Sequence, residues 1–273
     1  MRSFLFIVSL SFSLCTRSQV SVVSWNIRYD HAGDSLHAWA DRKQPMADWL
    51  QNSGAEVIGI QEGLFHQVQF LDSVLTNFTY VGAGREDGAL AGEFSAIFID
   101  TTRFFVLESS TFWLSETPGE VSVGWDAALP RVCTYALIQD KRTNKMCWVF
   151  NTHFDHMGGK AREEAARLIV SRIAVKNNTT RCPVVLTGDL NAEPKDPPLK
   201  VLGAIMSDGY ISFAPHAVRG TWNAFDCEQI HDKRIDYIMV NGTTFSAYDH
   251  ILLCDPEFGA LSDHWPVLAE LRF

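Results

Sequence analysis

The sequence predicts an α/β (α+β) fold in which two mixed β-sheets pack face to face with helices outside, a four-layer sandwich. Short β-rich runs alternate with amphipathic segments from residue 20 to residue 273. Strands that come in runs and are broken by helices are typical of such layered architectures. No repeat or linker interrupts this stretch, which therefore predicts a single catalytic domain over residues 20–273.

The strands are predicted from apolar and β-branched runs bounded by turn residues. Val20–Ile27 and Glu56–Gln61 have the apolar character of buried strands. Further strands are predicted at 93–100, 103–114, 131–139, 146–152, 183–187, 234–240 and 265–271. A polar turn at 140–145, between the strands predicted at 131–139 and 146–152, predicts a hairpin.

Two helices are predicted between these strands. Lys160–Lys176 is the clearest, because Ala165, Ile169 and Ile173 lie on one apolar face opposite charged residues. The polar, tryptophan-bearing segment 38–52 predicts a second helix between the first two strands. Each helix follows a strand and precedes another, which places helices outside the sheets.

The first 19 residues are predicted to be a secretory signal peptide. Arg2 precedes a short apolar run, 4–14, and small and polar residues follow it. The run is too short to span a bilayer as a helix. We therefore expect a protein that is secreted or periplasmic, without a stable membrane span.

The charge of the chain disfavours one class of ligand. Its formal net charge is −9, and no dense run of Lys or Arg occurs. Binding to long duplex nucleic acid depends on clustered cations that contact phosphates. Duplex nucleic acid is therefore not the expected substrate, although a bound metal cation would change the local field.

The cysteines indicate disulfides rather than a zinc site. Five of them follow the predicted signal peptide, and none has CxxC spacing. Export permits disulfides, and the odd number leaves at least one thiol without a partner in the same chain. Cys133 and Cys147, which flank the predicted hairpin turn, are the expected local pair.

Polar side chains gather where the apolar strands end and in one late turn. Each alone has an ordinary explanation as a turn or helix-start residue. Together they predict a site, because strand ends held by a sheet face a common edge. These side chains are Asn26, Glu62, His153, Asp189, Asn191, Asp263 and His264.

The residue types narrow the chemistry of this site. Carboxylates and amides are hard oxygen ligands, which suit Mg²⁺, or Mn²⁺ or Ca²⁺, better than zinc. The sequence contains no GxSxG nucleophile motif, and no cysteine adjoins these histidines. Metal, carboxylates and histidines together predict attack by activated water on a phosphoester.

Six motifs in order resemble the endonuclease/exonuclease/phosphatase superfamily, which includes deoxyribonucleases, deadenylases, neutral sphingomyelinases and inositol polyphosphate 5-phosphatases. The similarity covers nearly the whole chain after residue 19 and is greatest to a bacterial deadenylase-like branch. The motifs are Ser24–Arg28, Ile60–Glu62, Asn151–Asp155, Gly188–Asn191, Arg234–Ile238 and Ser262–His264.

The resemblance implies roles for the residues around the metal. Glu62 corresponds to the principal metal ligand, with Asn26 beside it, and Asp263 to a further acid of the metal site. Asp189 and Asn191 correspond to the pair that contacts the attacking water, the phosphate or a second metal. These roles define one expected metal-binding cluster.

The resemblance also implies the proton-handling residues. His264 corresponds to the catalytic histidine, and Asp236 to the carboxylate that orients it. His153 corresponds to a phosphate-contacting histidine of the deoxyribonuclease, deadenylase and sphingomyelinase branches. Either His264 or Asp189 is the base that takes the proton of the water.

Substrate contacts are expected from Arg131, Trp125 and Trp222, a cation for phosphate and two rings for stacking. The leading expectation is a phosphodiesterase acting on a nucleotide or oligonucleotide end. The alternatives are a phosphomonoesterase on a sugar or inositol phosphate and a sphingomyelinase-like lipid phosphodiesterase. Loops near Phe213 and Phe258 are the candidates for lipid contact.

Overall fold

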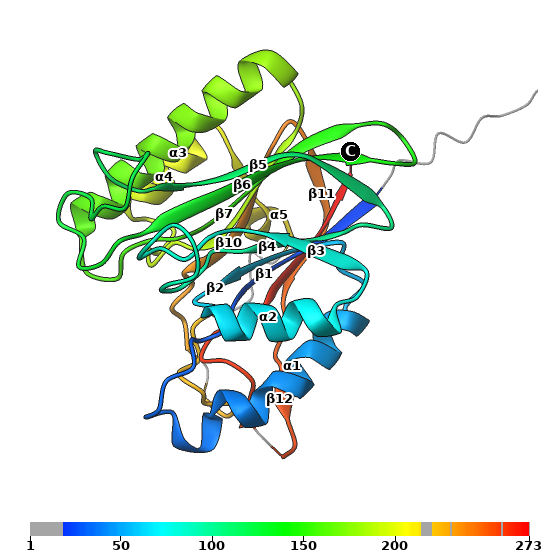
Figure 1. The fold of residues 1–273 in the computed structure, drawn as a ribbon, viewed down its shortest axis with the longest axis vertical. Helices are drawn as coiled ribbons and strands as arrows, with labels where there is room; N and C mark the ends of the chain where they lie inside the picture. The colour runs from blue at the N-terminus through cyan, green and yellow to red at the C-terminus, as the bar shows by residue number, and fades with distance from the viewer. Residues whose placement is uncertain (1–18, 214–219, 230, 258, 273) are drawn as a thin grey trace, which may run out of the picture.

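The computed structural model describes residues 19–213, 220–229, 231–257 and 259–272. Two six-stranded sheets lie face to face, and helices cover their outer faces (Figure 1). One sheet is covered by α3 (Gly159–Thr180) and α4 (Pro197–Gly203), and the other by α1 (Trp39–Asn52) and α2 (Phe65–Val74). The predicted sandwich of two mixed sheets with helices outside is confirmed.

The first sheet is mixed, and its one parallel pair matters for the site. Strands β1 and β2 run in parallel, joined by α1, while all other neighbours are antiparallel. Their carboxyl ends therefore meet at one edge of the sheet. The strand order is β11 (Thr244–His250), β14 (Val267–Arg272), β1 (Gln19–Asn26), β2 (Val57–Gln61), β4 (Ile97–Asp100) and β3 (Phe78–Val81).

The second sheet repeats this arrangement. Strands β7 and β8 are its parallel pair, and α3 joins them, so that their carboxyl ends also meet at one edge. The other neighbours are antiparallel. The order is β5 (Phe104–Trp113), β6 (Val132–Asp140), β7 (Met146–His153), β8 (Val184–Asp189), β10 (Asp236–Asn241) and β9 (Ser207–Asp208).

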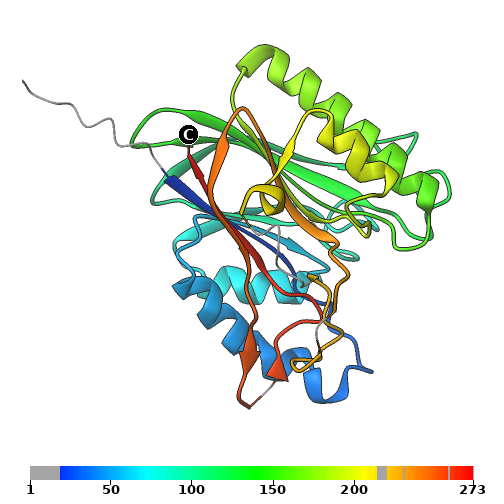
Figure 2. The same cartoon turned by 180° about the vertical axis from the view of Figure 1, so that it is seen from behind.

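Several short elements were not predicted from the sequence. Besides α2, α4, β3, β9 and β11, they include one 3₁₀ turn, one short helix and a two-stranded ribbon (Figure 2 shows the same molecule from behind). Most of them are too short for a periodic apolar pattern to develop. The 3₁₀ turn is η1 (Ser35–His37) and the short helix is α5 (Gly209–Phe213). The ribbon consists of β12 (Cys254–Asp255) and β13 (Gly259–Ala260).

A buried amide network connects the two sheets beneath the strand ends. Asn151 of β7, which is fully buried, donates from Nδ2 to the carbonyl oxygens of Ile60 and Ala96, both at 2.8 Å. Its Oδ1 accepts from Gln61 Nε2 at 2.8 Å and from Thr187 Oγ1 at 2.9 Å. Every hydrogen-bonding capacity of this amide is thereby used, and the bonds to Ile60, Gln61 and Ala96 cross the interface between the sheets.

The cysteine pairing differs from the prediction. Cys227 and Cys254 form the disulfide, whereas Cys133 and Cys147 are free and buried. The expected hairpin exists, but its register places Cys147 opposite Ile138. Cys133 packs in the core beneath α3, and Cys147 packs in the core between the sheets, so the two thiols lie on opposite faces and cannot pair.

Among the described residues, no helix has the length and apolar character needed to cross a membrane. The predicted signal peptide, 1–19, lies outside the described residues except for Gln19, which opens β1. The signal peptide and the assignment of residues 20–273 to one domain stay predictions.

Replacing Asn151 with Leu should destabilise the fold. The substitution removes four buried hydrogen bonds, so we expect the free energy of unfolding to fall by about 3 kcal/mol. Urea denaturation measures this difference, with Asn178→Leu on the exposed end of α3 as the matched control. A loss no larger than that of the control would show that the amide network does not hold the sheets together.

Candidate active site

One cross-strand row carries three of the predicted site residues. His153 ends β7, Asp189 ends β8, and Asp236 begins β10; the register pairs Asp189 with both neighbours. Neighbouring strands lie about 4.8 Å apart, so residues in one row are direct neighbours. All three are buried. The second sheet therefore contributes a compact half-site.

The first sheet contributes the other half of the site. Asn26 ends β1, and Glu62 follows β2. The buried Asn26 amide donates from Nδ2 to Glu62 Oε1 at 2.9 Å and to Asp189 Oδ2 at 3.0 Å. Its oxygen accepts from the backbone N–H of Arg28 at 3.0 Å. The Asn26 side chain thus joins the two half-sites, with its nitrogen towards the carboxylates.

The backbone is unusual at two of these positions. Glu62 has a φ of 65° and Asn191 a φ of 45°. Side-chain-bearing residues in this region cost on the order of 1 kcal/mol and occur where surrounding contacts fix them. Glu62 Oε2 accepts from the backbone N–H of Tyr29 at 3.1 Å, and Asn191 donates its backbone N–H to Asp189 Oδ1 at 2.9 Å.

His264 is oriented by a buried carboxylate. Its Nδ1 donates to Asp236 Oδ2 at 2.8 Å, and its Nε2 lies 3.9 Å from Asp189 Oδ2. Burial opposes protonation, but Asp236 and then Asp189 and Asp263 outweigh it and raise the pKa of His264 to about 10. The ring is held as a cation with Nε2 turned towards Asp189.

For Asp189, burial disfavours the charged form of the carboxylate. Burial and then the neighbouring carboxylate of Asp236 raise the pKa of Asp189 to about 7, although His264 and hydrogen bonds from Asn191 and Asn26 act against this rise. Burial likewise raises the pKa of Asp263. Buried carboxylates of this kind are what a bound cation would compensate.

His153 is neutral and faces Asn191. Burial, and then the cations of Arg131 and Arg85, hold the pKa of His153 well below its usual value. Asn191 Nδ2 donates to His153 Nε2 and to the carbonyl of Phe154, both at 3.0 Å. Because Nε2 is the acceptor, the proton of the neutral ring is on Nδ1.

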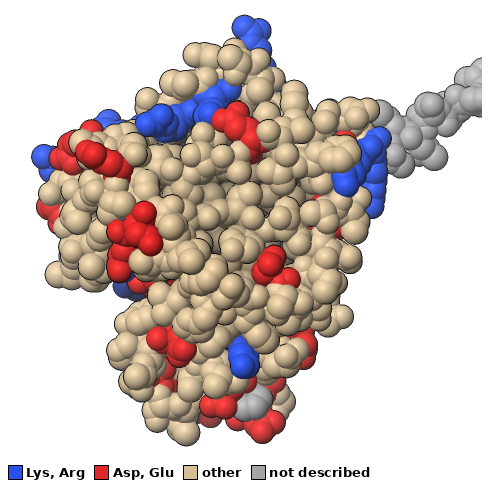
Figure 3. Space-filling view, in the orientation of Figure 1, with Lys and Arg blue, Asp and Glu red and all other residues tan. Residues whose placement is uncertain are grey.

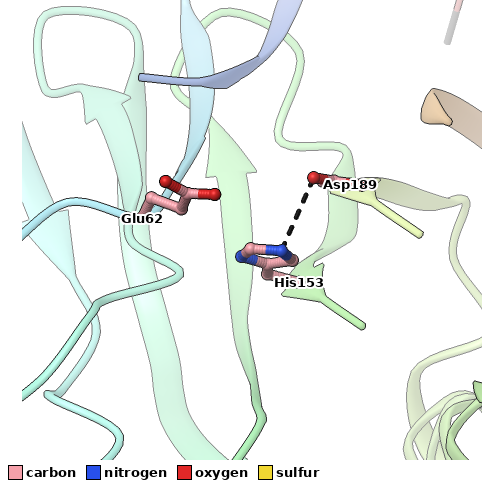
Figure 4. A group of neighbouring side chains, drawn as sticks. All are labelled: Glu62, His153 and Asp189. Carbon is pink, nitrogen blue, oxygen red and sulfur yellow. Dashed lines mark ion pairs between the residues drawn. The ribbon is translucent and has the colours of Figure 1, made fainter. Parts of the chain in front are cut away.

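The donor set fits a divalent metal. Glu62, His153 and Asp189 each offer one ligand atom, and these atoms lie within 4.8 Å of one another (Figure 4). Figure 4 shows His153 and Asp189 at the ends of neighbouring strands, joined by an ion pair, with Glu62 facing them from the segment after β2. Asp263 lines the same cavity. Carboxylate oxygens from Glu62, Asp189 and Asp263 are hard ligands suited to Mg²⁺, Mn²⁺ or Ca²⁺.

A buried arginine holds the loops that carry these groups. Arg42 of α1 donates to the carbonyl oxygens of Ile27 at 2.6 Å, Arg28 at 2.9 Å, Leu261 at 3.1 Å and His37 at 2.8 Å. These carbonyls belong to the segment after β1 and the segment before Asp263. Burial lowers the pKa of Arg42 to about 10, so that it stays charged near neutral pH.

A cavity of about 550 Å³ lies over this edge of the sandwich. Asn26 and Asp236 do not line the cavity. Asn26 contacts the lining residues Glu62 and Asp189, and Asp236 contacts His264. Trp125 does not belong to the wall, and its role in substrate binding stays a prediction. The predicted residues that line the cavity are Glu62, Arg131, His153, Asp189, Asn191, Trp222, Asp263 and His264.

The structure adds lining residues that sequence reasoning missed. Arg85 and Glu93 come from the segment between β3 and β4, and Arg28 and Lys233 also line the cavity. Arg28 is the last residue of the motif Ser24–Arg28, and Lys233 directly precedes the motif Arg234–Ile238. The segment between β3 and β4 carries no motif, and its glycine-rich sequence was the only signal that its backbone is specialised.

The model of the Endonuclease/Exonuclease/phosphatase family matches residues 23–264, and the chain belongs to this family. Members of the family are metal-dependent phosphoesterases, and this chain is an enzyme of that class, a hydrolase of phosphoesters. The family assignment made from the six motifs is confirmed.

Solved structures of bacterial relatives match almost their entire length. A family protein from Bacteroides thetaiotaomicron is 33% identical with a TM-score of 0.88, covering 94% of this chain and 98% of that chain. A mannosyl-6-phosphatase from the same organism is also 33% identical with a TM-score of 0.88, covering 93% and 100%.

A curated viral relative is more distant. Uncharacterized protein L388 of Acanthamoeba polyphaga mimivirus is 22% identical over 169 residues, 59% of this chain. The matched part spans 62% of that viral protein, so less than two thirds of its length corresponds to this chain.

Replacing Asp236 with Asn should reduce turnover by about 10²–10⁴-fold, because an amide neither fixes the tautomer of His264 nor supports its charge. Initial rates on any accepted phosphoester measure the effect. The exposed Asp232→Asn variant is the matched control and should keep full activity. Near-normal turnover in Asp236→Asn, with an unchanged melting temperature, would exclude the pair from catalysis.

Proposed function

We propose that this enzyme hydrolyses phosphate monoesters of a small sugar-like alcohol, with Mg²⁺ as the working ion. The observation that carries the proposal is a confined cavity in which buried cations surround the hard-ligand cluster. The mannosyl-6-phosphatase of Bacteroides thetaiotaomicron, a relative matched over its full length, supports the same substrate class. The proposed activity is the alternative of the sequence analysis, a phosphomonoesterase on a sugar phosphate, rather than the phosphodiesterase expected there.

The charges of the cavity support a doubly charged substrate group. A phosphate monoester carries about −1.5 to −2 charges near neutral pH. Apart from the histidines, the cavity wall has as many cations as carboxylates, so that the protonated His264 and a divalent ion would leave it with a net positive charge. The cations are Arg28, Arg85, Arg131 and Lys233, and the carboxylates are Glu62, Glu93, Asp189 and Asp263.

The face of the molecule drawn in Figure 3 supports a small substrate rather than a polymer. In Figure 3 the Lys and Arg side chains form separate small groups with Asp and Glu between them, and no basic field extends over this face. Duplex nucleic acid needs such a field. Of the two residues considered for lipid contact, Phe213 on the short α5 packs its ring against Phe245, and Phe258 lies outside the described residues.

The residues of the chain have separable tasks in this reaction. A divalent ion bound by the hard ligands supplies Lewis-acid stabilisation of the phosphoryl charge. Because Asp236 keeps His264 protonated, Asp189 is the group placed to accept the proton of the attacking water. His264 Nε2–H then stabilises the negative charge that develops beside Asp189. Arg131, buried at the cavity wall, binds the phosphoryl oxygens.

We also propose that the enzyme acts outside the cytoplasm. The support is the basic start, apolar run and small-residue exit of residues 1–19. Export would agree with the disulfide between Cys227 and Cys254, since such bonds persist in oxidising compartments.

The test compares p-nitrophenyl phosphate with bis-p-nitrophenyl phosphate, and mannose 6-phosphate with a dinucleotide, in Mg²⁺, Mn²⁺ or Ca²⁺. We expect kcat/KM to be at least about tenfold higher for the monoesters, a difference of about 1.4 kcal/mol in transition-state binding. A chelator should abolish both activities, and Mg²⁺ should restore them. Preference for the diesters would contradict the substrate class, and activity that survives chelation would contradict the metal-dependent mechanism.

A further inference from the structure

Three buried donor atoms around the cavity have no hydrogen-bond partner among the described residues. They are Arg85 Nε, Arg131 Nη1 and His153 Nδ1, and all three side chains line the cavity wall. A buried donor without a partner costs about 1–3 kcal/mol, so such groups are rare in a folded protein. Three in one cavity indicate the place of an anion that supplies the missing acceptors.

One carboxylate oxygen lies at the centre of this donor set. Glu93 Oε2 accepts from Arg85 Nη1 at 2.6 Å, but it lies 3.9 Å from Arg131 Nη1 and 3.8 Å from His153 Nδ1. The last two distances are too long for hydrogen bonds. Glu93 therefore fixes Arg85 while Arg131 and His153 keep a donor for a ligand.

The backbone holds Arg85 firmly in this position. Its N–H donates to the Glu93 carbonyl at 3.2 Å, and its carbonyl accepts from Trp113 Nε1 at 2.8 Å. Gly88, at a φ of 71°, lies against the same indole, and a Cβ there would come within 2.9 Å of the Trp113 ring. The segment between β3 and β4 is thus anchored on β5 at the residue that presents the guanidinium.

Two guanidinium groups share this small region. Burial, and also the neighbouring cation of Arg131, lower the pKa of Arg85, and Glu93 opposes the effect. Asp155 pairs with Arg131 on its other side, at 3.4 Å from Nε, and the two guanidinium cations still repel each other beside the cavity. An anion in the cavity would relieve this repulsion, and a doubly charged anion would relieve it more than a singly charged one.

We propose that Arg85, positioned by Glu93 and Trp113, is a second phosphate-binding cation that selects phosphate monoesters over diesters. This inference rests on the proposed phosphoesterase function and gives it a specificity residue. A monoester presents three non-bridging oxygens and two negative charges, whereas a diester presents two oxygens and one charge. The third oxygen takes the Nε–H of Arg85, and a diester puts a carbon substituent at that position.

The test compares Arg85→Gln with the wild-type enzyme in Mg²⁺. We expect kcat/KM for p-nitrophenyl phosphate to fall about 10–100-fold, the size of a lost charge-assisted hydrogen bond, and that for bis-p-nitrophenyl phosphate to change less than about threefold. Arg142→Gln, at an exposed arginine, is the matched control and should change neither value.

Binding of inorganic phosphate gives a readout independent of turnover. Calorimetry should show about a tenfold weaker affinity for Arg85→Gln than for the wild type, with partial recovery in Arg85→Lys because a point charge remains. Equal losses on both substrates, or unchanged phosphate affinity in a variant with a normal melting temperature, would overturn the proposal. If Arg85→Gln does not fold, Arg85→Lys must still shift the monoester-to-diester ratio towards the diester.

The proposal and the function on which it rests can fail separately. A wild-type enzyme that prefers diesters contradicts the proposed function, whatever Arg85 does. A wild-type enzyme that prefers monoesters, with the same preference in Arg85→Gln, contradicts only the role of Arg85.

Discussion

The Asn26 amide is the contact on which the site depends, because it is bonded to both sheets at once. Glu62 follows a strand of one sheet and Asp189 ends a strand of the other, and two carboxylates this close repel each other unless a donor or cation lies between them. Beneath it, Asn151 fixes the distance between the sheets, and Gly59 allows their close approach, since a Cβ there would lie 2.2 Å from Thr187 Oγ1. Packed strands thus hold Asn26, His153, Asp189 and Asp236, while Glu62, Asp263 and His264 lie in the adjoining segments.

Both sheets position their site residues in the same way. Each sheet has one parallel pair, β1 with β2 and β7 with β8, and the polar residues follow the carboxyl ends of these strands. Asp236 enters from β10, which runs the other way, so that it begins where Asp189 ends. That antiparallel neighbour is what gives His264 a buried carboxylate partner.

The sequence predicts the layered fold and the motif-bearing wall of the cavity, because both depend on local apolar runs and on the residues that end them. It does not predict Arg85 and Glu93, which reach the cavity through the long-range contact of one loop with Trp113. The pairing of Cys227 with Cys254 was missed for a related reason, since strand register and the face of a sheet decide which thiols meet. The placement of Trp125 away from the cavity wall likewise depends on a turn that no periodic pattern specifies.

The most direct test of this account is the binding of Mg²⁺ or Mn²⁺ to the protein by calorimetry, without substrate. The cluster draws on both sheets, so Glu62→Gln and Asp189→Asn should each weaken metal binding at least about tenfold, or about 1.4 kcal/mol, while the folded structure persists. Unchanged metal affinity in either variant would show that the two half-sites do not form one metal centre.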